Sequence, residues 1–401
     1  MSANAEAFDR WIRGPFVALN TELEALYFAR PDRADVEGVG AAIKARLQRE
    51  GQAHVVALWQ EGNTGDGFET AFGVLGNVGM YLGALRRHEQ TNPAREERSP
   101  FREASSLAMH VGTSIGMVPR FATAHLAQRN FAVRGLRKSF TSLADEFLFI
   151  DENTRGILSI QRAADALGRI VLLGVSNPVA DVEFTAALAA LETARAANAR
   201  LFAGLDVERF FYSVRPYYKP YRVGRTEYRG ANAGDFSGIN EVDLLLGLCR
   251  ANDPSYAQIL VEKTPFMVPE DQARLRECMR HRPLLDEFLA LAAAGGAGEP
   301  WFQRNARMFL RIVDVFAETA RQHHDELVRR FIVGPAQAMD QRHMAGLTAS
   351  GPPLGVLLRS LEVLRDQRMA APRADLETRH DDLARLRALC PAAPGAGPAT
   401  G

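Results

Sequence analysis

Over most of this chain, apolar residues recur at spacings of three and four positions, which is the period of an amphipathic α-helix. Strand-like alternation is rare. The best case is "YRVGRTEYRG" at 221–230, where Gly224 favours the turn of a short hairpin. The pattern therefore predicts an all-α protein with one small hairpin. The clearest helical segments are 181–204, 270–294, 302–333 and 354–369.

Short segments rich in glycine and proline interrupt the helical pattern, but none is long enough for an interdomain linker. We expect a smaller N-terminal helical region at 1–95, a large helical bundle at 96–370, and a C-terminal helix with a disordered tail at 371–401. The tail is predicted from the low-complexity ending "CPAAPGAGPATG".

Composition and charge exclude several classes of protein. The chain has 401 residues, 47% of them hydrophobic, which is enough for a large core. Its 48 basic and 48 acidic residues cancel, which disfavours binding to nucleic acid or to an anionic membrane. No apolar run is long enough to span a bilayer, and the N-terminus does not resemble a signal peptide. Three scattered cysteines predict neither a disulfide framework nor a zinc site, so we expect a cytoplasmic protein.

Two adjacent histidines lie in the predicted helix "RQHHDELVRRFIVGPAQ" at 321–337. His324 lies four positions from both Ala320 and Val328, so it fits the inward stripe, although the stripe alone does not exclude His323. An inert core histidine is the commoner outcome. The alternative is an axial ligand to haem iron, with Arg321 beside it for a propionate. Periodicity leaves both interpretations open.

A second cluster, "RFFYSVRPYYKPY" at 209–221, places Phe210 five positions before Arg215. An aromatic ring and a guanidinium in this arrangement can hold an aromatic amino acid, with its ring against Phe210 and its carboxylate in a bidentate pair with Arg215. The competing interpretation is a core aromatic helix whose arginine points to water. Spacing alone favours that second interpretation.

These segments resemble a known family. "FFYSVRPYYKPYRVGRTEYRG" resembles the substrate-contacting segment of the indoleamine 2,3-dioxygenases, and "RQHHDELVRRFIVGPAQ" resembles their proximal haem helix. "SIGMVPRFATAHL", "LLLGL" and "TPFMVPEDQARL" match further parts of that family in the same order. The similarity is closer still to the group typified by monodechloroaminopyrrolnitrin synthase, through "NVGMYLGALRRH", "RKSFTSLADE" and "VRPYYKPYRVG". The resemblance spans about residues 70–365.

The resemblance implies an indoleamine 2,3-dioxygenase-like haem-binding bundle that holds haem b and uses O2 as co-substrate. It places the iron ligand at His324 rather than His323, and a propionate partner at Arg321. A proximal imidazole leaves the opposite side of the iron open for dioxygen. On the substrate, the resemblance assigns ring packing to Phe210 and carboxylate pairing to Arg215.

On the distal side, "FREAS" at 101–105 matches a Phe and a Ser of the dioxygenases, which implies that Phe101 contacts substrate and Ser105 is catalytic. A helix-surface serine is an equally good interpretation of Ser105. His88 and His110 are further distal candidates, and an inert role is favoured for each.

The implied function is a haem-dependent oxygenase or oxidative rearrangement enzyme of secondary metabolism, acting on a tryptophan-like amino acid. The segment "GANAGDFSGINEV" at 230–242 and the prolines Pro352 and Pro353 depart from the dioxygenase loops. Mono-oxygenation or ring rearrangement is therefore favoured over ring-cleaving dioxygenation. Two alternatives stay open: a non-catalytic haem or gas-binding protein, and a helical interaction protein without cofactor. By analogy with the family, we expect a homo-oligomer.

Overall fold

The computed structural model describes residues 1–62, 66–337 and 354–391. The expectations for Pro352 and Pro353, and for the last ten residues of the tail, lie outside the described residues. The N-terminal half of the fold begins with α1 (Ala3–Arg13), α2 (Pro15–Phe28), α3 (Ala41–Glu61), α4 (Phe68–Arg87), α5 (Arg102–Ser114) and η1 (Thr123–His125).

The next elements are α6 (Ala144–Leu173), α7 (Ala180–Gly204), α8 (Val207–Arg209), η2 (Phe210–Val214), η3 (Arg215–Tyr218), β1 (Tyr221–Val223) and β2 (Thr226–Tyr228). They are followed by α9 (Ser237–Leu246), α10 (Pro254–Lys263), η4 (Thr264–Phe266), α11 (Pro269–Cys278), α12 (Leu284–Ala293), η5 (Gly296–Gly298), α13 (Pro300–Gln322), η6 (His323–Val333), α14 (Gly334–Gln337), α15 (Leu354–Arg368) and α16 (His380–Leu389).

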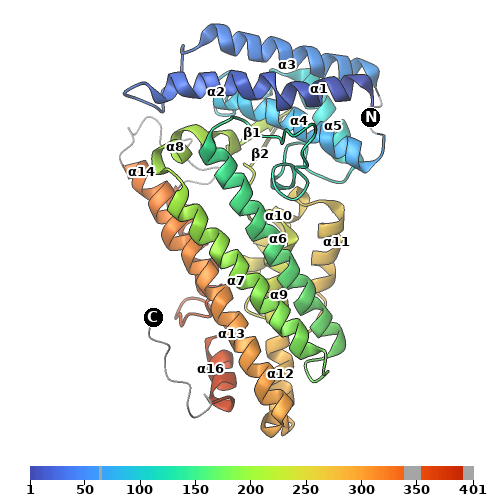
Figure 1. Ribbon diagram of the computed structural model, residues 1–401, viewed down its shortest axis with the longest axis vertical. Coiled ribbons are helices and arrows are strands. Elements are labelled where there is room, and N and C mark those ends of the chain that lie inside the picture. Colours follow the sequence, from blue (N-terminus) through green and yellow to red (C-terminus); the bar gives the residue numbers. More distant parts are fainter. Residues whose placement is uncertain (63–65, 338–353, 392–401) are drawn as a thin grey trace.

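The helices form two parts, as Figure 1 shows: α1 to α5 lie across one end of the molecule, and the long helices α6, α7 and α13 run away from them along its long axis. α7 packs between α6 and α13, and α9 packs against α6. Apart from the β1–β2 hairpin and an isolated bridge between Val133 and Leu136, the regular secondary structure of the described chain is helical. The all-α prediction is confirmed.

Two large apolar cores correspond to these parts. The first joins α1 to α5 and also takes in Phe140, Tyr217 and Tyr221 from later in the chain. The second joins α6, α7, α9, α12 and α13. Tyr217 lies within η3 and Tyr221 follows it in β1, so the segment that carries Arg215 is anchored in the first core. The domain boundaries at 95 and 370 stay predictions.

The predicted elements differ from the structure at two places. The expected helix 270–294 is two helices, α11 and α12, because Pro283 lacks an N–H and restricts the residue before it. The expected helix 302–333 begins at Pro300, and from His323 onward it becomes a π-helix. The hairpin is confirmed, with Tyr221 opposite Tyr228 and Gly224 at φ 58°.

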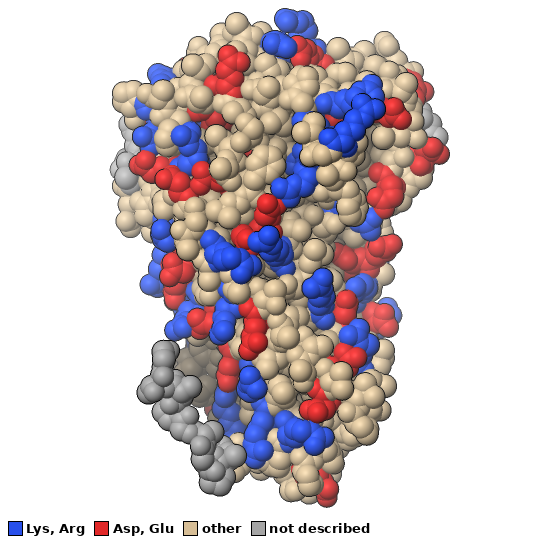
Figure 2. All heavy atoms as spheres, viewed as in Figure 1, with Lys and Arg blue, Asp and Glu red and all other residues tan. Residues whose placement is uncertain are grey.

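On the face shown in Figure 2, basic and acidic side chains are interspersed rather than gathered into patches of one sign. Many of the surface charges form ion pairs, such as Arg169 with Glu183 and Arg387 with Asp314. In the described part of the chain, no helix combines the length and the apolar character that crossing a membrane requires.

Glycines on α4 allow other backbone to approach this helix closely. A Cβ on Gly79 would lie 2.1 Å from the backbone nitrogen of Phe121, and a Cβ on Gly83 would lie 3.2 Å from the carbonyl oxygen of Tyr217. A side chain at Gly79 would therefore push away the segment that carries Phe121. Gly73, on the same helix, has no atom within 4 Å of its Cβ position.

We expect Gly79→Ala to lower the free energy of unfolding by about 1–3 kcal/mol or more, because the clash is with rigid backbone. The matched control, Gly73→Ala, is expected to raise it by up to about 1 kcal/mol, since alanine is the better helix former. Urea unfolding followed by circular dichroism measures both. Equal effects of the two substitutions would contradict the close packing of α4 on Phe121.

Candidate active site

The histidine doublet lies where α13 changes its hydrogen-bonding pattern. Upstream, Phe309, Phe316 and Ala320 are buried in or beside the second core. From His323 the helix is a π-helix, and its end is marked by the bond from the Gly334 N–H to the Arg329 carbonyl five residues earlier. Such π segments are rare and are frequent at functional sites.

His324 is the inward member of the doublet. Its side chain is buried, with only 7% of the residue exposed, whereas His323 is exposed. His324 Nδ1 lies 3.1 Å from Asp325 Oδ1 and 3.2 Å from Arg365 Nη1. One ring nitrogen cannot donate to the carboxylate and accept from the guanidinium in the same tautomer, so only one of these contacts is a hydrogen bond at a time.

When Nδ1–H of His324 donates to Asp325, the lone pair of the ring is on Nε2. Nε2 makes no hydrogen bond to any described residue. A carboxylate on one ring nitrogen and a free lone pair on the other is the usual arrangement of a metal-ligating imidazole. His324 therefore has the chemistry that a haem iron requires from its proximal ligand.

His323 has a different environment. Its ring is exposed, yet burial within the surrounding protein lowers its pKa to about 4, with further contributions from Arg368 and Lys263. His323 is thus neutral at pH 7 and is the rival candidate for a metal ligand.

Beside the doublet, a buried ion pair fixes α15 against α9. Asp243, which is fully buried, accepts hydrogen bonds from Arg368 Nε at 2.8 Å and Nη2 at 2.7 Å, and from the Tyr256 hydroxyl at 2.7 Å. Gln322 precedes the histidine doublet and Gln367 precedes Arg368, and the side-chain oxygen of each is buried without a partner. The haem fit rests instead on the donor set: His324 offers a neutral imidazole with one ring nitrogen beside a carboxylate and the other without a described partner, which is what an iron ligand requires.

The aromatic segment contains η2, the other π-helical element of the described chain. Arg215 N–H bonds to the Phe210 carbonyl five residues earlier, which closes η2. The Phe210 ring packs against Phe149 with centroids 5.1 Å apart, and meets Phe331 edge-on at 6.0 Å. Phe331 lies on η6, seven residues after His324. The two segments predicted to bind substrate and haem are therefore in direct contact.

Arg215 is buried, with 7% of the residue exposed, and its guanidinium forms no hydrogen bond or ion pair with any described residue. Its guanidinium lies 5.5 Å from the Phe211 ring. Burial lowers the pKa of Arg215 to about 10, so the group is still charged at neutral pH. An unpaired buried charge costs several kcal/mol, which is tolerated where a ligand supplies the opposite charge. The interpretation in which this arginine points to water does not describe it.

The other predicted site residues lie elsewhere. Phe101, the residue before α5, is in the first core against Tyr81, and Ser105 is buried on α5 with its hydroxyl unpartnered. Arg321 is exposed and pairs with Glu318 on α13. The structure brings Phe210 and Arg215 to the histidine helix, whereas Phe101 and Ser105 lie at α5 and Arg321 on the outer face of α13.

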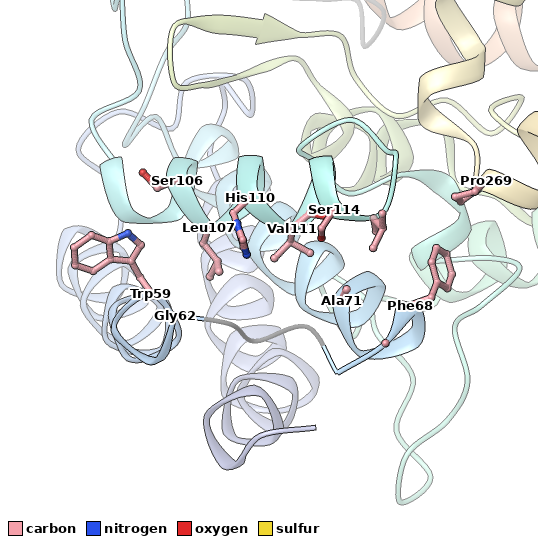
Figure 3. A pocket seen from close by; sticks show the side chains of 12 residues that line it. Trp59, Gly62, Phe68, Ala71, Ser106, Leu107, His110, Val111, Ser114 and Pro269 are labelled. Atoms are coloured by element: carbon pink, nitrogen blue, oxygen red, sulfur yellow. The ribbon is translucent and has the colours of Figure 1, made fainter.

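His88 has an inert role, because both of its ring nitrogens are engaged: Nδ1 with the Tyr27 hydroxyl at 2.9 Å and Nε2 with Asn20 Oδ1 at 2.8 Å. His110 instead lines a surface pocket of about 900 Å³ together with Trp59 and Phe68, as Figure 3 shows. None of the residues that line this pocket belongs to η2, η3 or η6, so it is separate from the candidate site.

Three residues near the site carry no assignment from sequence: Lys219, Asp325 and Arg365. Asp325 follows the histidine doublet directly, and Lys219 follows Arg215 by four positions within a quoted motif. For both residues, the signal in the sequence is that they lie close to a predicted site residue. Arg365 reaches His324 from α15, which no local pattern predicts.

Comparison with known families identifies the chain. A family model described as monodechloroaminopyrrolnitrin synthase PrnB matches residues 2–390, which includes both π-helical segments and the N-terminal helices. Its enzymes are haem-dependent and use dioxygen, in agreement with the available imidazole of His324. The chain therefore belongs to the monodechloroaminopyrrolnitrin synthase family of haem-dependent oxidative enzymes.

Proposed function

We propose that the protein oxidises a tryptophan-like aromatic amino acid, by oxygenation or by oxidative ring rearrangement, in secondary metabolism. The observation that carries this proposal is the buried Arg215, whose guanidinium has no partner among the described residues, on the same segment as Phe210, whose ring contacts Phe331 of the histidine helix. Bound haem supplies the redox-active iron with which dioxygen is used. The chain's own residues bind the cofactor, orient the substrate and exclude water.

On the cofactor side, His324 Nε2 is the proposed iron ligand, and Asp325 holds the proton on Nδ1. Arg321 is the proposed partner of a propionate. Its present partner, Glu318, is three residues away on the helix surface, and such exposed pairs contribute little stability. Exchanging that carboxylate for a propionate therefore costs little.

On the substrate side, Phe210 packs against the aromatic ring, and Arg215 pairs with the α-carboxylate in a bidentate contact. Phe101 and Ser105 are proposed on the distal side. The buried hydroxyl of Ser105 has no partner in the described protein, which supports a role in hydrogen bonding to substrate. A module that only binds haem or gas would need neither Phe210 nor Arg215.

Cys249, Cys278 and Cys390 are all free thiols. Free cysteines are typical of reducing compartments, which supports our proposal that the protein is cytoplasmic. A homo-oligomer, likewise, is proposed only by analogy with the family.

The test of the proposed function is turnover by the haem-loaded protein under ¹⁸O₂ with a supplied reductant. We expect L-tryptophan or chlorinated tryptophan to be consumed and L-tyrosine to be a poorer substrate. Mass spectrometry of the product separates the reactions: one labelled oxygen indicates mono-oxygenation, two indicate dioxygenation, and none indicates rearrangement. Haem-loaded protein that neither consumes nor binds any of these amino acids would contradict the proposal and favour a gas-binding module.

A further inference from the structure

A second cation follows Arg215 at the end of η3. The N–H of Lys219 bonds back to the Pro216 carbonyl, so its side chain starts one turn after that of Arg215. η3 packs directly on α4, and the absence of a side chain at Gly83 allows the 3.2 Å approach described above. This contact places the end of α4 near η3, and Arg86 and Arg87 at that end interact electrostatically with Lys219.

The charged groups that act on Lys219 are three arginines and one carboxylate: Arg86, Arg87, Arg215 and Glu89. Arg87 is neutralised by Glu24, through bonds of 2.7 and 2.9 Å from Nε and Nη2. Glu89 is the only acid in the group, and it already accepts from Arg86 Nη1 at 3.0 Å. Arg215 and Lys219 therefore have no carboxylate of their own among the described residues.

Two further observations agree with a missing anion. Nε of Arg86 is buried without a partner. Burial, together with the neighbouring arginines, lowers the pKa of Lys219 to about 7. A lysine is destabilised in this way when cations surround it and no anion is bound. Arg86, Arg215 and Lys219 together offer several unused donors and an excess of positive charge.

We propose that Lys219 and Arg215 form a two-cation site for a carboxylate, with Lys219 as a second anion-binding residue. The inference rests on the proposed function, which gives Arg215 the substrate carboxylate. The carboxylate at Lys219 has two candidate sources with the same chemistry: the α-carboxylate of the amino acid and a propionate of the haem. The experiment below separates them.

The first arm uses the haem-loaded protein and follows the Soret band during titration with L-tryptophan and with tryptamine, which lacks the carboxylate. If Lys219 binds the substrate carboxylate, Lys219→Met raises the Kd for tryptophan by about 10- to 100-fold and leaves that for tryptamine unchanged. Lys219→Arg, which keeps the charge, restores most of the affinity. The contribution of Lys219 is present when it is protonated, so wild-type affinity for tryptophan falls above about pH 7, and this dependence is absent in Lys219→Met.

The second arm measures haem retention, as the rate of haem transfer to apomyoglobin. If Lys219 binds a propionate, Lys219→Met speeds the loss of haem b but not the loss of haem dimethyl ester, whose propionates are uncharged. Unchanged tryptophan affinity together with unchanged haem b retention would overturn the proposal. This arm still reports on Lys219 if tryptophan is not the substrate, so failure of the proposed function is recognised separately.

The thermal stability of Lys219→Met gives a further prediction. Removing a cation that is unpaired in the ligand-free protein is expected to raise the Tm of haem-free Lys219→Met above that of wild type, because the folded state no longer holds a desolvated charge. A lower Tm would mean that Lys219 has a structural partner, and this would also contradict the two-cation site.

Discussion

His324→Ala, expressed with haem supply, is expected to be purified without a Soret band, whereas His323→Ala keeps the band of a histidine-ligated b-type haem. His324 is the buried member of the doublet, with Nδ1 held by Asp325 and Nε2 unpartnered. Its removal takes away the one bond between protein and iron that the proposal contains. Loss of haem should therefore be nearly complete rather than graded.

The structure makes this pair of variants informative, because His323 is also neutral and its ring is accessible. His324→Gly adds a control for folding: imidazole added to the medium should enter the space left by the side chain and restore the band. Far-ultraviolet circular dichroism checks that helix content is unchanged. A protein that loses haem in His323→Ala and keeps it in His324→Ala would show that the register of the π-helix is misassigned.

Arg215→Met is expected to keep the Soret band and to lose the spectral shift that L-tryptophan induces in wild type. Arg215 is 7% exposed and its guanidinium has no partner among the described residues, so its contribution to carboxylate binding is not weakened by a protein anion. Loss of one partner of a buried charge pair typically costs about 2–5 kcal/mol, which corresponds to a rise in Kd of about 30-fold or more.

Arg215→Lys is the matched variant, since it keeps the charge but not the planar fork of donors. We expect an intermediate Kd for tryptophan and no change for tryptamine in either variant. If tryptophan produced the same shift in Arg215→Met as in wild type, the carboxylate would have to bind elsewhere. Phe210 and Arg215 would then contribute to packing and not to substrate binding.

Periodicity predicted two helices well: α7 and α15 match the expected segments within one residue at each end. It did not single out α6, the long central helix, which contains Gly156 and Gly168. Glycine lowers intrinsic helix propensity, and α6 is stabilised by packing against α7 and α9. The break before α12 has a signal in the sequence, because Pro283 cannot continue a helix from the preceding residues.

The site was only partly predictable. The inward position of His324 follows from its distance to Ala320 and Val328, because a small change in helical pitch leaves that face buried. The burial of Arg215 does not follow from spacing, since it depends on α4 approaching η3 at Gly83. The contact between Phe210 and Phe331 joins segments more than 100 residues apart, and only the tertiary fold shows it.

A crystal structure of the haem-loaded protein with L-tryptophan is the most direct measurement. It is predicted to show His324 Nε2 bonded to the iron, the indole ring against Phe210 and the carboxylate on Arg215. Iron bound to His323, or an unliganded His324 with the amino acid away from Arg215, would contradict the account.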